Sequence, residues 1–126
     1  MRMGVGGDPY PALQRYAPKA FAAYLEAIDT DPPDAVLDGL ARFGHVLMLT
    51  VGTRAKVAPH EQDGPEDYIR RLHHSGVIGA EQSSAFRTLV MNPRMYAEGL
   101  DEDFVFAISS HEAAETLADW FEDQFR

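Results

Sequence analysis

The apolar side chains between Pro33 and Lys56 recur at helical spacing, and this segment constrains the fold more than any other part of the chain. In its second half, apolar residues cover nearly every face of the expected helix. A helix of that kind has to be covered by other elements, so we predict that it is central and buried. The residues of its main stripe are Val36, Leu40, Phe43, Leu47 and Val51.

Three glycines interrupt this predicted helix, at Gly39, Gly44 and Gly52. Each costs about 1 kcal/mol of helix stability relative to alanine. Their presence has two interpretations. Either neighbouring helices approach closely at these positions, or the glycines are tolerated without a structural role.

An amphipathic helix is predicted before the central one, over Pro11–Ile28. Pro18 lies inside its pattern and should kink the helix or mark its true start. The Gly-rich residues 1–10 are expected to be flexible. The N-terminal stretch lacks the apolar run of a secretory signal.

Two shorter helices are predicted after the central one. The first covers Pro65–Ser75, and Gly76 is a natural residue to follow its end. The second begins at Gly79 or Ala80 and runs to Met91. It should end at the Asn92-Pro93 pair, because a residue before proline disfavours helical backbone angles.

The segment before the last helix is ambiguous. Phe104–Ile108 alternates enough for a short strand or an extended arm. Ser109 and Glu112 have the spacing of a capping box, which favours a last helix that starts near Ser110. A continuous helix from Asp101 is the alternative. The pattern as a whole predicts a single all-α domain over residues 1–126, a bundle of four to five helices.

The composition excludes several classes of protein. The chain has no cysteine, which excludes a disulfide scaffold, a thiolate metal site and a cysteine nucleophile. Its longest apolar run, Val46–Val51, is far shorter than the roughly 20 residues of a membrane span. We therefore expect a soluble cytoplasmic protein that does not interact with membranes.

The net charge of −9 makes the chain a poor default binder of nucleic acid, because neutralising phosphates supplies most non-specific affinity. The charge is uneven, since Arg54–Arg94 holds six basic and five acidic residues. Glu98–Arg126 holds nine acidic residues and one arginine. This distribution is typical of a solvated acidic helix face, and the alternative is a locally basic groove inside an acidic shell.

The five histidines lack the spacing that places two metal ligands on one helix face. His45 lies within the apolar helix, so we predict a hydrogen-bonded core histidine. His111 lies close to Glu112 and Glu115, where a weak metal site is a minor alternative. No cofactor and no metal ion are expected.

The stretch from Tyr68 to Tyr96 consists of a short helix, a Leu-x-x-x-Gly-Val-Ile step and an amphipathic helix that ends Phe-Arg-x-Leu-Val. This order of parts resembles domains of the HEPN superfamily, helical bundles found in toxin–antitoxin pairs, restriction systems and RNA-processing proteins. The resemblance spans about Asp34–Gln124. It implies a homodimer that pairs across the motif-bearing helices, or a complex with a partner protein. The residues that carry it are Leu72, Gly76, Val77, Ile78, Phe86, Arg87, Leu89 and Val90.

Active members of that superfamily carry an arginine four to six residues before a histidine, with a polar residue directly after the arginine. In one alignment of the motif, Arg87 is the arginine and Asn92 stands in place of the histidine. In a shifted alignment, Met91-Asn92 stands in place of the arginine and its polar neighbour, and Tyr96 stands in place of the histidine. An amide cannot shuttle a proton, and phenols titrate near pH 10. The motif is therefore degenerate, and we expect no RNase activity. Its candidate positions are Arg87, Asn92, Arg94 and Tyr96.

Three functions follow as hypotheses. The first is a non-catalytic interaction protein in a defence, toxin–antitoxin or regulatory complex. The second is a divergent metal-independent ribonuclease that uses Arg87, Arg94 and Tyr96, or the neighbouring His73 and His74. The third is a ligand-binding helical bundle. Arg54 and His60 also match the arginine-to-histidine spacing, but a spacing this loose is common by chance.

Overall fold

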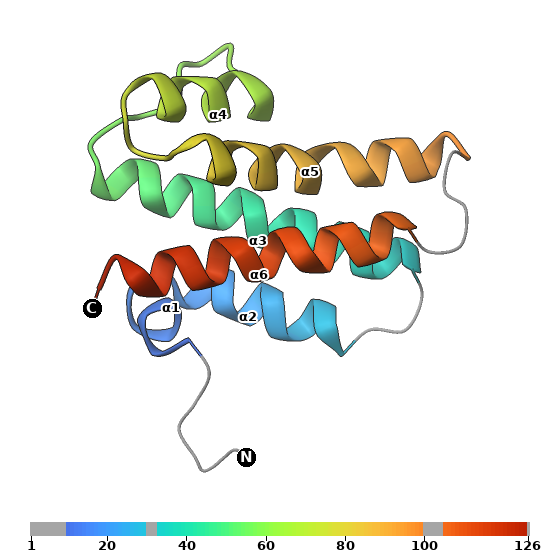
Figure 1. The fold of residues 1–126 in the computed structure, drawn as a ribbon. Helices are drawn as coiled ribbons and strands as arrows, with labels where there is room; N and C mark the ends of the chain where they lie inside the picture. Colours follow the sequence, from blue (N-terminus) through green and yellow to red (C-terminus); the bar gives the residue numbers. More distant parts are fainter. Residues whose placement is uncertain (1–9, 30–32, 100–104, 126) are drawn as a thin grey trace.

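Six α-helices form the part of the chain that the computed structural model describes, residues 10–29, 33–99 and 105–125 (Figure 1). These ranges contain no strand. The all-α prediction is confirmed, with six helices instead of four or five. Residues 1–9, expected to be flexible, lie outside the described ranges. The helices are α1 Pro11–Tyr16, α2 Pro18–Ile28, α3 Pro33–Arg54, α4 Pro65–His74, α5 Ala80–Ala97 and α6 Val105–Asp123.

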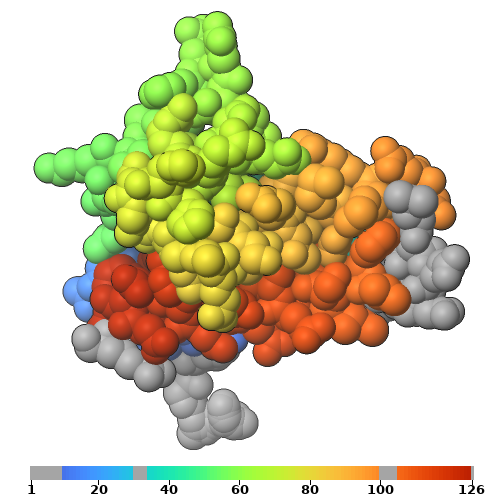
Figure 2. Space-filling view, turned by 45° about the horizontal axis from the view of Figure 1, so that its top comes forward, coloured from blue at the N-terminus to red at the C-terminus, as the bar shows by residue number. Residues whose placement is uncertain are grey.

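The long helix α3 is the centre of the arrangement. It packs against α2, α5 and α6, and more weakly against α4. Helix α1 packs against α2 and α6, and α4 packs on the first part of α5 (Figures 1 and 2). The predicted main stripe of α3 is buried throughout, and Leu40, Phe43 and Leu47 have no exposed surface. The prediction of a central helix is confirmed.

The three glycines of α3 lie where neighbouring side chains come close. A Cβ atom on Gly39 would lie 2.8 Å from the Cβ of Ala27 in α2, and one on Gly44 would lie 2.8 Å from Leu89 in α5. At Gly52 it would overlap the hydroxyl of Tyr68 in α4. Close helix approach, the first of the two interpretations, is therefore correct.

Helix α3 is the one helix in the described part that is long and apolar enough to cross a membrane by length and composition. Half of that window is buried inside the protein, and α2, α5 and α6 pack on it. A helix at the core of a bundle passes the same test of length and composition.

Pro18 begins a separate helix instead of kinking a longer one. Ala17 separates α1 from α2 with a non-helical backbone, at φ −141° and ψ 57°. Proline at the first helical position lacks only an N–H that would have no partner there. The boundary that Pro18 predicts is thus real.

The turn after α4 follows the prediction. Gly76 has φ 78°, a left-handed angle that suits glycine, and Val77 N–H donates to the carbonyl of Leu72 at 3.0 Å. Helix α5 then starts at Ala80. Its first turn is closed by the Gln82 side chain, which accepts a hydrogen bond from the Gly79 N–H at 2.9 Å.

The predicted end of this helix at Asn92-Pro93 is wrong, because α5 continues through Pro93 to Ala97. A proline inside a helix removes one backbone hydrogen bond and strains the preceding turn. Here Asn92 ties this stretch to α6 by three hydrogen bonds, which offset that cost. The motif turn that the sequence suggested is therefore a continuous helix.

The strand or extended arm predicted over Phe104–Ile108 is also wrong from Val105 onward, where α6 begins, while Phe104 lies outside the described residues. Ser109 does not cap a helix start at Ser110. Its hydroxyl instead donates to the carbonyl of Phe106, 3.3 Å away within the same helix. The alternative of a continuous helix is correct from Val105 onward, while its predicted start at Asp101 lies outside the described residues.

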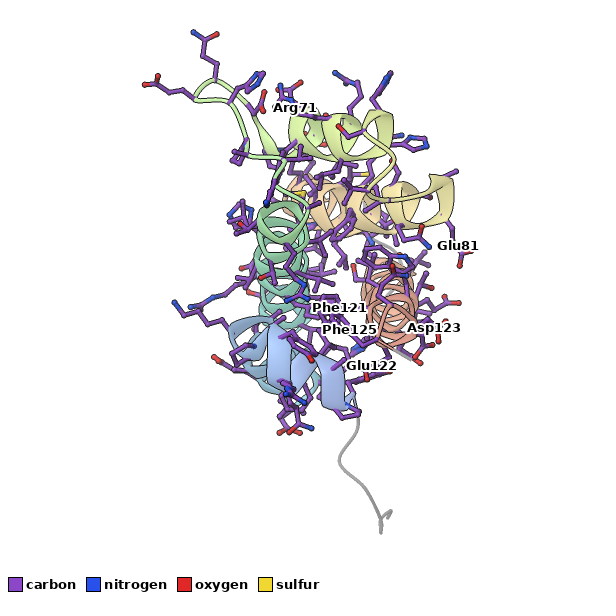
Figure 3. All side chains as sticks on the ribbon, turned by 90° about the vertical axis from the view of Figure 1, so that its left-hand side faces the viewer. Arg71, Glu81, Phe121, Glu122, Asp123 and Phe125 are labelled. Atoms are coloured by element: carbon purple, nitrogen blue, oxygen red, sulfur yellow. The ribbon has the colours of Figure 1, made fainter. Side chains whose placement is uncertain are left out.

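The first helix is capped from the far end of the chain. Tyr10 precedes α1 in a left-handed conformation and supplies no capping side chain. The carboxylate of Glu122 in α6 instead accepts hydrogen bonds from the N–H groups of Ala12 at 3.0 Å and Leu13 at 2.8 Å. In Figure 3, Glu122 lies beside α1, on the opposite side of the molecule from Arg71. This contact joins two segments that are about 110 residues apart in the sequence.

Candidate functional site

Asn92, one of the candidate motif positions predicted from the sequence, is buried, with 4% of its surface exposed. Its amide donates to the carbonyl of Phe106 at 3.1 Å and to the hydroxyls of Ser109 at 2.8 Å and Ser110 at 2.9 Å. Two N–H groups are thus shared among three acceptors of α6. Asn92 holds two helices together inside the protein and does not face solvent.

The other motif candidates lie elsewhere on α5. Arg87 is exposed and lies five residues before Asn92, so the two are about 140° apart around the helix. Arg94 is exposed too, and its guanidinium forms an ion pair with Glu66 of α4 at 2.9 Å. Tyr96 is half-buried one turn after Asn92. The structure therefore does not bring the four candidates together into one site.

Arg87 and Arg94 do share a face. They are seven residues apart, which places them within about 20° of one another around the helix. Figure 2 shows α5 beside α6, an arrangement that leaves this helix at the surface. Two arginines could attract a phosphate, but a proton carrier is also needed for metal-independent cleavage. Among the described contacts, no histidine touches either arginine.

A polar cluster joins the loop before α4 to the last turn of that helix. Arg71 forms an ion pair with Asp63 and approaches the Nδ1 atom of His60 at 2.7 Å. The backbone N–H of His60 donates to Asp63 at 2.8 Å. The Arg71 hydrogen bond, followed by that N–H, holds the pKa of the Asp63 carboxyl below its usual value. The cluster closes the loop between α3 and α4.

Arg54 and His60, which match the family spacing, are held in different contacts. The Arg54 guanidinium lies 4.8 Å from the ring centre of Tyr16 and 4.9 Å from that of Phe125. Those two rings stack at 4.3 Å. His60 instead contacts Arg71. The pair is therefore not a catalytic unit, and Arg54 braces α3 against α1 and the end of α6.

The remaining histidines form no metal site within the described ranges, where no group of three or more His, Asp or Glu side chains is arranged to hold a metal ion. His45 is exposed, so the prediction of a core histidine is wrong. It lies on the side of α3 that other helices leave open. His73 and His74 are exposed at the end of α4, and His111 is half-buried in α6.

Two tyrosines contact one another in the core near α1. The rings of Tyr10 and Tyr24 meet edge to face, with their centres 5.8 Å apart. Burial, together with the neighbouring phenol and the carboxylates Asp119 and Glu115, raises the pKa of the Tyr10 hydroxyl. Burial is also the main cause that raises the pKa of Tyr24. Both phenols therefore stay protonated at neutral pH and serve packing.

An open cleft of about 880 Å³ lies between α1 and the C-terminal part of α6. Charged side chains form much of its wall, including Arg15, Asp119 and Asp123. Glu122 also lines it but is engaged with the start of α1. Small-molecule sites have mainly apolar walls, so this cleft does not favour the ligand-binding hypothesis.

No protein-family model matches this chain, and neither a curated protein nor a solved structure matches it. The fold is an all-α packed domain, and the resemblance to the HEPN superfamily rests on the sequence pattern described above.

Sequence reasoning missed two contacts of the structure. The Glu122 cap has a weak signal, namely a helix start at Pro11 with no capping residue before it. The cluster of Asp63 and Arg71 has none, because the two residues are eight positions apart across a loop and a helix start. Both contacts depend on tertiary structure.

Proposed function

We propose that this chain is a non-catalytic interaction domain of the HEPN type. It acts in the cytoplasm as a homodimer, or bound to a partner protein in a defence, toxin–antitoxin or regulatory complex. The observation that supports this function best is the state of Asn92. The residue at the motif position is buried and bonded to three acceptors of α6, so it has a structural role in place of a catalytic one.

The exposed apolar residues support pairing at the α5–α6 end. Val105 and Ile108 on α6 are 55% and 58% exposed, the highest values among the large apolar side chains described. Met91 and Met95 on α5 are half-buried, and Asn92 between them bonds to the first turns of α6. The family resemblance implies pairing across the motif-bearing helices, which include α5. Burying such side chains against a second copy removes apolar surface from water.

Light scattering on the purified protein tests this proposal. We expect a mass near twice the 14.0 kDa of the chain at high micromolar concentration. Ile108→Asp should give a monomer, because it places a charge inside the interface. Leu25→Asp is the matched control, since Leu25 is an exposed apolar residue on α2 and should leave the dimer intact.

A monomeric wild-type protein at that concentration contradicts the homodimer. The same holds for an Ile108→Asp variant that keeps the wild-type mass. A variant that loses its helical circular dichroism is replaced by Val105→Asp, which tests the same surface.

The absence of catalysis is tested with fluorescently labelled single-stranded RNA. We expect no cleavage above background, because Asn92 and Tyr96 stand where the motif needs a histidine and the −9 charge weakens RNA capture. The ribonuclease hypothesis is supported instead if wild-type protein cleaves RNA and Arg87→Ala does not. A loss of cleavage on His73→Ala or His60→Ala would place the active site at α4.

A further inference from the structure

The side of α3 that faces away from α6 carries a groove that the proposed dimer contacts do not use. In Figure 3, α1 and α2 lie below α3, α4 lies above it and α6 lies on one side, while no described helix covers the opposite side. The groove has a volume of about 490 Å³. Its lining residues are Tyr16, Lys19, Val46, Leu49, Thr50, Thr53 and Arg54.

The floor of the groove is an apolar helical stripe. Val46 and Leu49 are only half-buried, although they belong to the most apolar part of the chain. The Thr50 hydroxyl donates to the carbonyl of Val46 at 2.9 Å, so it does not need a partner in the groove. Positions 46, 49, 50 and 53 follow the i, i+3, i+4, i+7 spacing of one helix face. The stripe is about 10 Å long, two helical turns.

The charged groups of the groove all have the same sign. Lys19 and Arg54 belong to its lining, which contains no acidic side chain, although the chain carries a net charge of −9. Neither residue forms an ion pair in the described part of the chain. The guanidinium of Arg54 is held in place by the stacked rings of Tyr16 and Phe125. The groove is therefore apolar along its floor and cationic at its edges.

We propose that this groove binds one amphipathic helix of a partner protein, with an apolar stripe flanked by aspartates or glutamates. Helix-in-groove recognition places apolar side chains at i, i+3, i+4 and i+7 against such a floor. The positive edges select acidic flanks. A second copy of this chain does not supply that helix from its acidic α6, because the apolar stripe of α6, including Leu117 and Phe121, is buried in its own core.

The probe is a fluorescein-labelled synthetic helix with leucines at i, i+3, i+4 and i+7 and glutamates beside them, measured by fluorescence anisotropy on the full chain. A second peptide has lysines in place of the glutamates. We expect the glutamate peptide to bind at least about tenfold more tightly than the lysine peptide. This preference should weaken as salt is added.

Two variants and one control locate the binding site. Leu49→Asp should weaken the glutamate peptide at least about tenfold, because it places a charge on the floor. Lys19→Glu should weaken it about threefold to tenfold. Lys19 is exposed, so this variant is expected to keep the fold even if Leu49→Asp does not. Arg70→Glu removes an exposed arginine of α4 that does not line the groove and should leave the affinity unchanged.

Equal affinity for the two peptides overturns the proposal, as does an affinity that neither Lys19→Glu nor Leu49→Asp changes. If Leu49→Asp lowers the mass of the protein in light scattering, the groove binds a second copy instead. If the protein binds phosphatidylglycerol vesicles but not the glutamate peptide, and Lys19→Glu abolishes vesicle binding, the occupant is a lipid surface.

Discussion

Asn92 and Arg71 each join two segments of the protein through several hydrogen bonds, but their surroundings are opposite. Asn92 is neutral and buried between α5 and α6, and its partners are a carbonyl and two hydroxyls. Arg71 is charged and partly exposed, with a carboxylate and an imidazole as partners. The first contact is inside the bundle, whereas the second closes a loop at its surface.

The difference determines what each contact contributes. A buried donor that loses its partners keeps the full cost of leaving water, so the network around Asn92 is expensive to disrupt. When a surface ion pair is broken, water replaces the lost partners, so the free energy of unfolding changes little. Disrupting the two contacts should therefore lower the free energy of unfolding by clearly different amounts. Truncation of an apolar core residue provides the reference with which both losses are compared.

Leu47→Ala should cause the largest loss in the free energy of unfolding among these variants. Leu47 has no exposed surface in the middle of α3, so the variant leaves a cavity. We expect the free energy of unfolding to fall by about 2–5 kcal/mol. Urea denaturation followed by circular dichroism measures it. A loss below about 1 kcal/mol would mean that α3 is not the centre of the bundle.

Asn92→Ala should rank second, with a loss of about 1–3 kcal/mol in the same experiment, because it leaves Phe106, Ser109 and Ser110 short of their donor. Asn92→His introduces the histidine that the motif resemblance implies, yet it should also destabilise, since the ring replaces an amide that bonds three acceptors. Thr88→Ala on the same helix is the control, because Thr88 bonds only within α5. A loss no larger than that of the control contradicts the role of Asn92.

Asp63→Asn should have the smallest effect, visible mainly through its pH dependence. Arg71 lowers the pKa of Asp63 in the folded state, so the contribution to stability is present above the unfolded pKa of about 3.9 and is lost as the pH falls through the lower folded value. Thermal melts should show a wild-type advantage near pH 7 that begins to decline near pH 4 and disappears below the folded pKa. Asp38→Asn, at an exposed aspartate of α3, is the control. If the wild type stays more stable than Asp63→Asn at a pH below the folded pKa of Asp63, the difference does not come from the ionised Asp63 carboxylate.

The same contrast explains which features could be predicted from the sequence. The periodicity of α3, its glycines and the Gly76 turn are local or repeat along one helix, and the structure confirms all three. Pro93 and the Ser109 capping spacing are local rules too, but tertiary contacts override both. The proline rule predicts that the helix ends before Pro93, but the hydrogen bonds of Asn92 to α6 support its continuation.

The candidate site was predicted less well than the fold. The sequence shows that a histidine is missing, but not that Asn92 points into the core while Arg87 points outward. Helical spacing alone places them on different faces, but only the packing of α6 decides which face is buried. His45 was misplaced for the same reason, since an apolar helix with one open side can carry a polar residue on that side.

The Glu122 carboxylate has a consequence for how the chain is made. Glu122 accepts a hydrogen bond from the N–H of Ala12, yet the ribosome adds Glu122 to the chain 110 residues later. N-terminal segments generally begin to fold first. Helix α1 has six residues, too few for a stable helix on its own. It must therefore wait for α6 before its first turn is capped. Among the six described helices, α1 leaves the ribosome first and is among the last to be completed.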